Sequence, residues 1–168
     1  MLLAAINRDL FLAVKAAHLV AVTVGFGGVM LAGVYARRAA RLGGTEGLAI
    51  AQTVDDVSAK WAAPFQYAVI VTGVLLVLVS DSFFKFEEEW ISVSIVIYLG
   101  IIAFQHAVQR PNYRRMAELR RQLLEVRPVP PALASELDTR ARRAEITGAV
   151  LDLAVVGVIA IMLWKPGR

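Results

Sequence analysis

The chain has 168 residues, of which 58% are apolar and 19% are charged, with a formal net charge of +4. Soluble domains are nearer half apolar and a quarter charged, so this composition excludes a disordered chain and argues against an ordinary soluble enzyme. Half of the chain falls in four apolar stretches: 10–35, 62–80, 90–109 and 146–164. They contain only two charged residues, Lys15 and Asp152. Each stretch is close to the roughly 20 residues that cross a bilayer as a helix, which predicts an all-α integral membrane protein.

The basic residues show which side each connection faces. Segment 36–61 carries four of them and segment 110–145 carries nine, more than the other connections hold. The positive-inside rule places both segments in the cytoplasm and both termini outside. We therefore expect a four-helix bundle with N-out/C-out topology, formed by a single domain that spans residues 1–168. The same bias accounts for the basic isoelectric point near 9.8, so we expect no nucleic-acid partner. The cytoplasmic arginines are expected to meet anionic lipid headgroups.

The first helix is expected from about Leu10, after a short outer lead of residues 1–9. Gly43 and Gly44 should break the chain after it. The segment 48–61 has helical apolar spacing and predicts an amphipathic helix on the cytoplasmic surface. Pro64 should kink or break the joint with the second membrane helix.

The second and third membrane helices are expected to form a hairpin through 81–89. A second cytoplasmic amphipathic helix should start at Pro111, and the prolines near residue 130 should end it. A further helix from about Ala132 should continue into the fourth membrane helix, up to Lys165. The tryptophans fall at predicted helix ends, as in an interfacial aromatic belt: Trp61, Trp90 and Trp164. The chain has no cysteine, which excludes disulfides, thiolate metal sites and covalent haem attachment.

Polar residues inside a membrane are costly and are candidates for function. Counting along the helices at 1.5 Å per residue places His18, Thr72 and Tyr98 about 12 Å from the outer boundary. Lys15 shares a helix face with His18, one turn nearer the outside. A second polar layer is expected near the cytoplasmic boundary, consisting of Gln66, Tyr67, Gln105, His106 and Asp152.

Both histidines of the chain fall within predicted membrane helices, a common way to hold haem in a helix bundle. Their depths differ by about 12 Å, which disfavours one haem held by His18 and His106 together. A site with His18 as the only histidine, completed by Tyr98 or left open, agrees better with the depths. The alternative is structural: His18 hydrogen-bonds Tyr98 or Thr72 and holds the bundle together.

Two short motifs carry a family resemblance. The chain opens with Lys15-Ala16-Ala17-His18 followed by Gly27-Gly28, and it closes with Lys165-Pro166-Gly167. In these features and in its helix order it resembles a bacterial membrane family, the domain of unknown function 2269. One departure is Gly25, where that family often has an aromatic residue. The resemblance implies a multi-pass protein of the bacterial cytoplasmic membrane.

The Lys-x-x-His opening is also similar to that of HemJ-type protoporphyrinogen oxidases and CopD-type copper-resistance proteins. Trp90 and His106 match a tryptophan and a histidine of their third helix. This resemblance implies a haem b site with His18 as iron ligand, Lys15 near a propionate, and Thr72, Tyr98 and His106 as further candidates. The early lysine of that helix is missing at Ser92–Ser94, which argues against the oxidase activity.

Three functions stay open. The first is a haem-associated redox or porphyrin-handling subunit. The second is a non-catalytic assembly subunit, as a homo-oligomer or in a larger membrane complex. The third is a proton, ion or metal transport subunit, with a path marked by Lys15, His18, His106 and Asp152.

Overall fold

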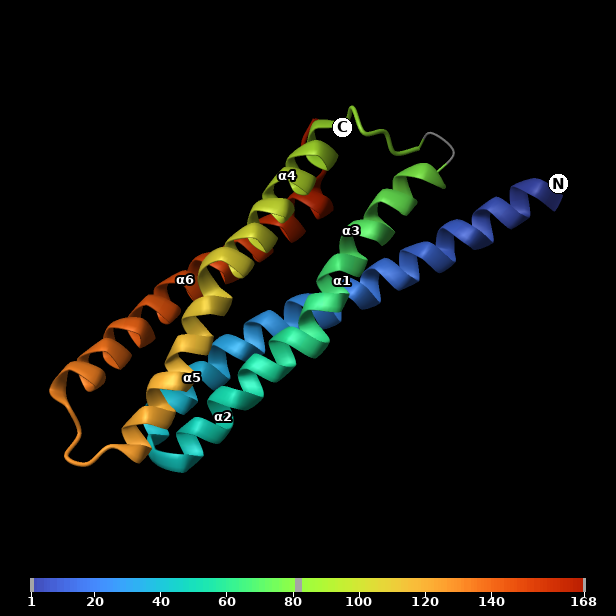
Figure 1. The fold of residues 1–168 in the computed structure, drawn as a ribbon. Coiled ribbons are helices and arrows are strands. Elements are labelled where there is room, and N and C mark those ends of the chain that lie inside the picture. The colour runs from blue at the N-terminus through green and yellow to red at the C-terminus, as the bar shows by residue number, and fades with distance from the viewer. Residues whose placement is uncertain (1, 81–82, 168) are drawn as a thin grey trace.

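The computed structural model describes residues 2–80 and 83–167, with side chains from residue 7 onward, and its regular elements there are all helical (Figure 1). The helices are α1 (Leu2–Leu42), α2 (Gly44–Val57), α3 (Ala63–Leu78), α4 (Glu89–Phe104), α5 (Arg110–Glu125) and α6 (Pro131–Trp164). Two π-helical turns, η1 (Ser58–Ala62) and η2 (Gln105–Gln109), join α2 to α3 and α4 to α5. Within the described residues, four continuous helices are long and apolar enough to cross a membrane. The expected all-α membrane bundle is confirmed.

The first helix is longer than predicted. Residues 2–9 are helical instead of forming an outer lead, and α1 runs on to Leu42. Its end lies where the glycine pair predicted a break: Gly43 and Gly44 have φ values of 64° and 53°, which L side chains rarely adopt.

The chain does not break at Pro64, and no separate helix begins at Pro111, for a shared reason. The segment 48–61 is helical and leads through η1 into α3, as expected, whereas the helix expected to begin at Pro111 continues α4 through η2. Each proline stands two residues after a π turn, at Pro64 and Pro111. A proline ring clashes with the carbonyl four residues earlier, and a π turn widens the helix at that point. The chain therefore passes both prolines without a break.

The helices form two pairs at the end that carries the termini. α1 packs on α3 and α4 packs on α6, and α1 also contacts α6. α3 and α4 are connected through 79–88 yet diverge toward that end, so the expected hairpin is open (Figure 1). The fourth helix is a single rod from Pro131, as predicted, and ends at Lys165 in a left-handed conformation with φ 47°.

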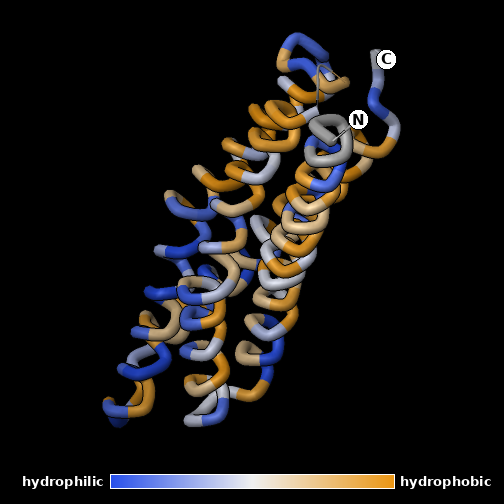
Figure 2. The backbone as a smooth tube through the Cα atoms, turned by 90° about the vertical axis from the view of Figure 1, so that its right-hand side faces the viewer, coloured by the Kyte–Doolittle hydropathy of each residue, from blue (hydrophilic) through white to orange (hydrophobic). Residues whose placement is uncertain are grey.

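A buried apolar cluster joins all four rods at mid-bundle. It consists of Ala21, Phe26, Val69, Tyr98, Ile101, Leu151, Val155 and Val158. The rings of Phe26 and Tyr98 meet edge to face, with centroids 5.6 Å apart. Figure 2 shows apolar residues along the half that carries the termini and hydrophilic residues gathering toward the opposite end.

The arginine-rich end extends beyond the membrane. α6 has 34 residues and is about 51 Å long, against a hydrocarbon core of about 30 Å. In this extension Glu136 accepts hydrogen bonds from Arg115 at 3.1 Å and from Arg140 at 2.8 Å. These guanidinium groups, that of Arg115 foremost, hold the pKa of the Glu136 carboxyl below its usual range. The Arg115–Glu136 ion pair therefore joins α5 to α6, and the Arg140–Glu136 pair lies within α6.

Candidate functional site

The main cavity lies between the two helix pairs, at the end that carries the termini. We name it the outer cavity, after the orientation that the basic residues predict. Its volume is about 480 Å³, and its walls come from α1, α3, α4, α6 and the segment before α4. Most of the lining is apolar. Its polar residues are Lys15, His18, Ser94, Tyr98 and Lys165.

His18 is the best-anchored polar residue of the outer cavity. Its Nδ1 lies 2.9 Å from the Thr72 hydroxyl, one of the two partners expected, and that hydroxyl donates to the Ala68 carbonyl at 2.6 Å. Because the single hydroxyl proton goes to Ala68, Nδ1 of His18 donates and Nε2 carries the lone pair. Gly73 leaves room for the ring, since a Cβ there would lie 3.3 Å from Cε1 of His18. The imidazole is thus held from α3, by the Thr72 hydroxyl and by the space at Gly73.

Tyr98 lines the same cavity but forms its hydrogen bond with a different partner. Its hydroxyl donates to the backbone carbonyl of Gln66 at 3.0 Å and thereby ties α4 to α3. The hydrogen bond to His18 that the depths allowed is not formed among the described residues. Lys15 lines the cavity one turn outward from His18, as expected.

Ser94 is a member of the outer cavity that sequence reasoning missed. Its Oγ is buried and has no hydrogen-bond partner among the described residues. An unpaired buried hydroxyl costs free energy, so a polar group of a ligand would stabilise it. The serine itself gave no signal in the sequence, because its burial depends on how α4 leans away from α3.

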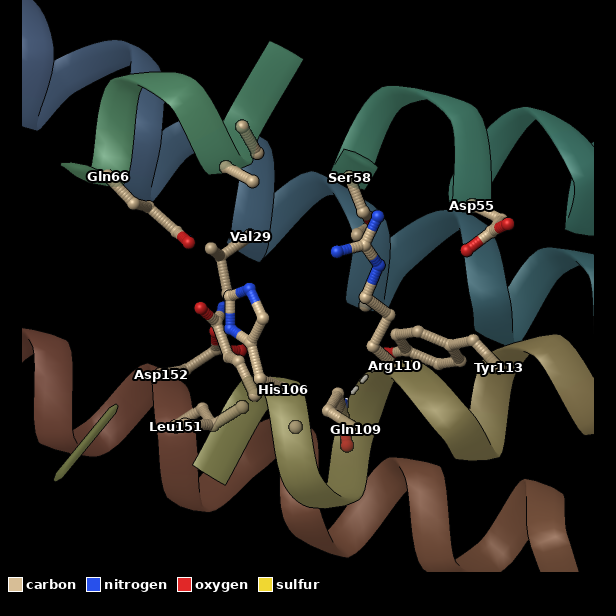
Figure 3. A pocket seen from close by; sticks show the side chains of 16 residues that line it. Val29, Asp55, Ser58, Gln66, His106, Gln109, Arg110, Tyr113, Leu151 and Asp152 are labelled. Atoms are coloured by element: carbon tan, nitrogen blue, oxygen red, sulfur yellow. Dashed lines mark hydrogen bonds between the residues drawn. The ribbon is translucent and has the colours of Figure 1, made fainter. Parts of the chain in front are cut away.

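The second polar layer is gathered in a smaller space, which we name the inner pocket. It has a volume of about 50 Å³ and lies beside both π turns (Figure 3). Four of the five predicted members line it: Gln66, Gln105, His106 and Asp152. The fifth, Tyr67, is an exposed residue outside the lining that contacts the pocket through its hydrogen bond to His106. Gln66 is only 5% exposed and points from α3 toward His106 and Asp152 (Figure 3). The volume is enough for a few water molecules and too small for a cofactor.

Two charged residues of the inner pocket were not predicted, Asp55 from α2 and Arg110 from α5. Asp55 Oδ1 and Arg110 Nε are buried without a hydrogen bond among the described residues, as is Gln105 Oε1. The sequence placed Asp55 and Arg110 in cytoplasmic segments, because it gave no sign that π turns would carry the helices past the prolines.

His106 belongs to the inner pocket and is fully engaged. Its Nδ1 lies 3.0 Å from the carbonyl of Ile102, and its Nε2 lies 2.9 Å from the hydroxyl of Tyr67. Because a carbonyl only accepts, Nδ1 donates and Nε2 accepts from the tyrosine in the neutral ring. His18 and His106 thus line different cavities and have different partners.

Asp152 lies beside His106 (Figure 3). No ion pair or hydrogen bond joins the two among the described residues. Among all residues that the structure describes, no group of three or more histidine and carboxylate side chains is placed to hold a metal ion.

A sequence model of one family matches residues 12–166, and that family is described as a predicted integral membrane protein, DUF2269. The comparisons with curated proteins and with solved structures found no match. The resemblance to HemJ-type and CopD-type proteins stays a prediction. With 155 consecutive positions matched, including the Lys15–His18 motif and the Lys165-Pro166 end, the chain belongs to the DUF2269 family of integral membrane proteins.

Proposed function

We propose that this protein lies in a bacterial cytoplasmic membrane and binds haem b, or a closely related porphyrin, in its outer cavity. In this proposal it is a redox or porphyrin-handling subunit. One observation carries the proposal: His18, whose Nδ1 is paired with the Thr72 hydroxyl at 2.9 Å, lines an apolar cavity of about 480 Å³. Neutral imidazole nitrogen is the commonest protein ligand of haem iron.

The residues present fit such a group. The volume of the outer cavity is within the range of about 300–1,000 Å³ that small-molecule and cofactor sites occupy. Its walls are apolar, and the buried hydroxyl of Ser94 offers a hydrogen bond to a polar substituent. Only one histidine lines the cavity, so one axial position of the iron would be open or taken by a ligand from elsewhere.

Each neighbour of His18 has a defined task in this proposal. Thr72 fixes the tautomer and the ring orientation, as outer partners of ligating histidines do. Gly73 admits the ring, and Tyr98 holds α3 at its distance from α4 through Gln66. Bound haem would supply one-electron chemistry, whose potential the axial ligand and the burial would set.

The experiment is a titration of the detergent-purified protein with hemin. We expect a sharpened Soret band that saturates at one hemin per chain, measured against identical micelles without protein. A spectrum that matches hemin in empty micelles throughout the titration would contradict the proposal. Protein that co-purifies only with phospholipid and takes up no hemin would do so as well.

Thr72→Val is expected to weaken hemin binding by about 10- to 100-fold, because outer hydrogen bonds to a ligating histidine contribute effects of this size. Valine keeps the shape of threonine but leaves Nδ1–H of His18 unpaired. The matched control is Thr23→Val, since Thr23 makes the same kind of bond within its own helix, to the carbonyl of Leu19, and is exposed on α1. Equal hemin affinities of the two variants in the same titration would argue against the role of Thr72.

A further inference from the structure

The outer end of the outer cavity carries two lysines. We propose that the cavity selects ligands that have an apolar body and an acidic group at the outer end, with Lys15 and Lys165 as the groups that bind the acid. The inference deepens the proposed function, since haem b is one ligand of this kind. It also applies to any other amphipathic acid, so it can be tested separately.

Lys15 supplies the first positive charge. It lies on the face of α1 that carries His18, one turn nearer the outside, and lines the cavity. Among the described residues it has no ion pair. A lysine in an apolar stretch keeps its charge near the membrane boundary, with its stem along the apolar wall. Its ammonium group is thus available to an acid at the mouth of the cavity.

Lys165 supplies the second charge from the opposite side. It follows the last residue of α6, and its Nζ lies 5.0 Å from the ring centroid of Phe84 and 5.7 Å from that of Trp90. Both rings line the cavity, and Phe84 also contacts Phe11 of α1, with centroids 6.4 Å apart. The aromatic rings therefore hold the Lys165 ammonium at the mouth, without a carboxylate partner among the described residues.

One acidic residue of the segment between Phe84 and Trp90 is already engaged. Glu88 accepts a hydrogen bond from the indole of Trp90 at 2.7 Å and another from the backbone N–H of Lys85 at 3.0 Å. These bonds orient its carboxylate toward the loop before α4. Neither Lys15 nor Lys165 forms an ion pair with a described residue, so both can bind an acid from a ligand.

The cavity is thus polar at its mouth and apolar along its length, with the lone pair of His18 and the hydroxyl of Ser94 in its walls. Two sources offer the matching chemistry. One is a porphyrin, which has carboxylates at one edge of an apolar ring, so that the ring can face inward while the carboxylates face the lysines. The other is a long-chain lipid acid. An uncharged ester of either one has the same apolar body and lacks the charge, which isolates the contribution of the lysines.

The experiment compares two acid and ester pairs at low ionic strength: hemin with hemin dimethyl ester, and cis-parinaric acid with its methyl ester. Binding is followed by the Soret band for the first pair and by fluorescence for the second. The proteins are wild type, the double variant Lys15→Gln/Lys165→Gln, and the control Lys85→Gln. Lys85 is an exposed lysine of the same end that does not line the cavity. Circular dichroism checks that each variant is folded.

We expect wild type and Lys85→Gln to bind the acid of at least one pair about tenfold more tightly than its ester, as hydrogen bonds to charged groups predict. In the double variant the acid and the ester should bind within about twofold of each other. Equal binding of acid and ester by wild type would overturn the inference, and so would a preference that persists in the double variant.

The outcomes also separate this inference from the proposed function. A Soret band that depends on His18, with no preference for the acid in either pair, would overturn the inference alone. A lysine-dependent preference in the parinaric pair, with no uptake of hemin, would overturn the proposed function and leave a lipid acid as the ligand. Failure of both acids to bind would overturn both.

Discussion

His18→Ala should abolish the Soret band of the hemin complex, whereas His106→Ala should retain it. Of the two histidines, His18 is the one that lines the outer cavity. Its hydrogen bond to Thr72 uses Nδ1, and with Nδ1 as the donor Nε2 has a lone pair. His106 lies in the inner pocket, where the Ile102 carbonyl and the Tyr67 hydroxyl engage both of its nitrogens. The measurement is a hemin titration of the two variants, with thermal unfolding by circular dichroism to compare their stabilities.

A rescue experiment separates ligation from a merely structural role of His18. The alanine variant leaves space for an imidazole beside Gly73, so imidazole added at millimolar concentration should restore the band. A structural role would give a different pattern: the band would weaken in both variants in proportion to their stability, and imidazole would restore neither. Loss of the band in His106→Ala alone would contradict the assignment outright.

The bundle was predictable from the sequence because a bilayer imposes a simple length requirement. Four apolar stretches with two charges among them have one simple interpretation, a bundle of membrane helices, and the helical spacing of apolar residues beyond them predicted the helical extensions. The predicted breaks failed at Pro64 and Pro111. Proline indicates that a regular α-helix is disturbed there, but it does not tell a break from a π turn, since that choice depends on how the flanking helices pack.

The two polar layers were predictable in part, for a similar reason. Depth along a helix depends only on residue count, so Gln66, Gln105, His106 and Asp152 were placed in one layer, and they line one pocket. The hydrogen-bond partner of each side chain was not predictable. The Tyr98 hydroxyl donates to the backbone carbonyl of Gln66, and a backbone acceptor has no signature in the sequence.

The outer cavity itself could not be predicted. It exists because α3 leans with α1 and α4 leans with α6 (Figure 1). The sequences of α3 and α4 are apolar on all sides, so no polar face shows which neighbour each helix will contact. Ser94 and Lys165 became site candidates only once this divergence was visible.

Gly28→Ala is expected to lower the free energy of unfolding by about 1–3 kcal/mol, the usual cost of overpacking a filled interior. A Cβ at Gly28 would lie 2.8 Å from Cβ of Ala62, a buried residue of η1. Neither atom belongs to a flexible side chain, so α1 and η1 would have to move apart. The measurement is unfolding of the detergent-purified protein by a denaturing detergent, followed by circular dichroism.

The neighbouring glycine provides the control. A Cβ at Gly27 would meet no heavy atom within 4 Å among the described residues, and alanine favours a helix over glycine by up to about 1 kcal/mol. Gly27→Ala should therefore leave the unfolding free energy unchanged or raise it. Because the two residues are adjacent on α1, a general effect of adding a methyl group would shift both variants in the same direction. Opposite signs would show that α1 contacts η1 at Gly28, and equal losses would mean that the two helices do not meet there.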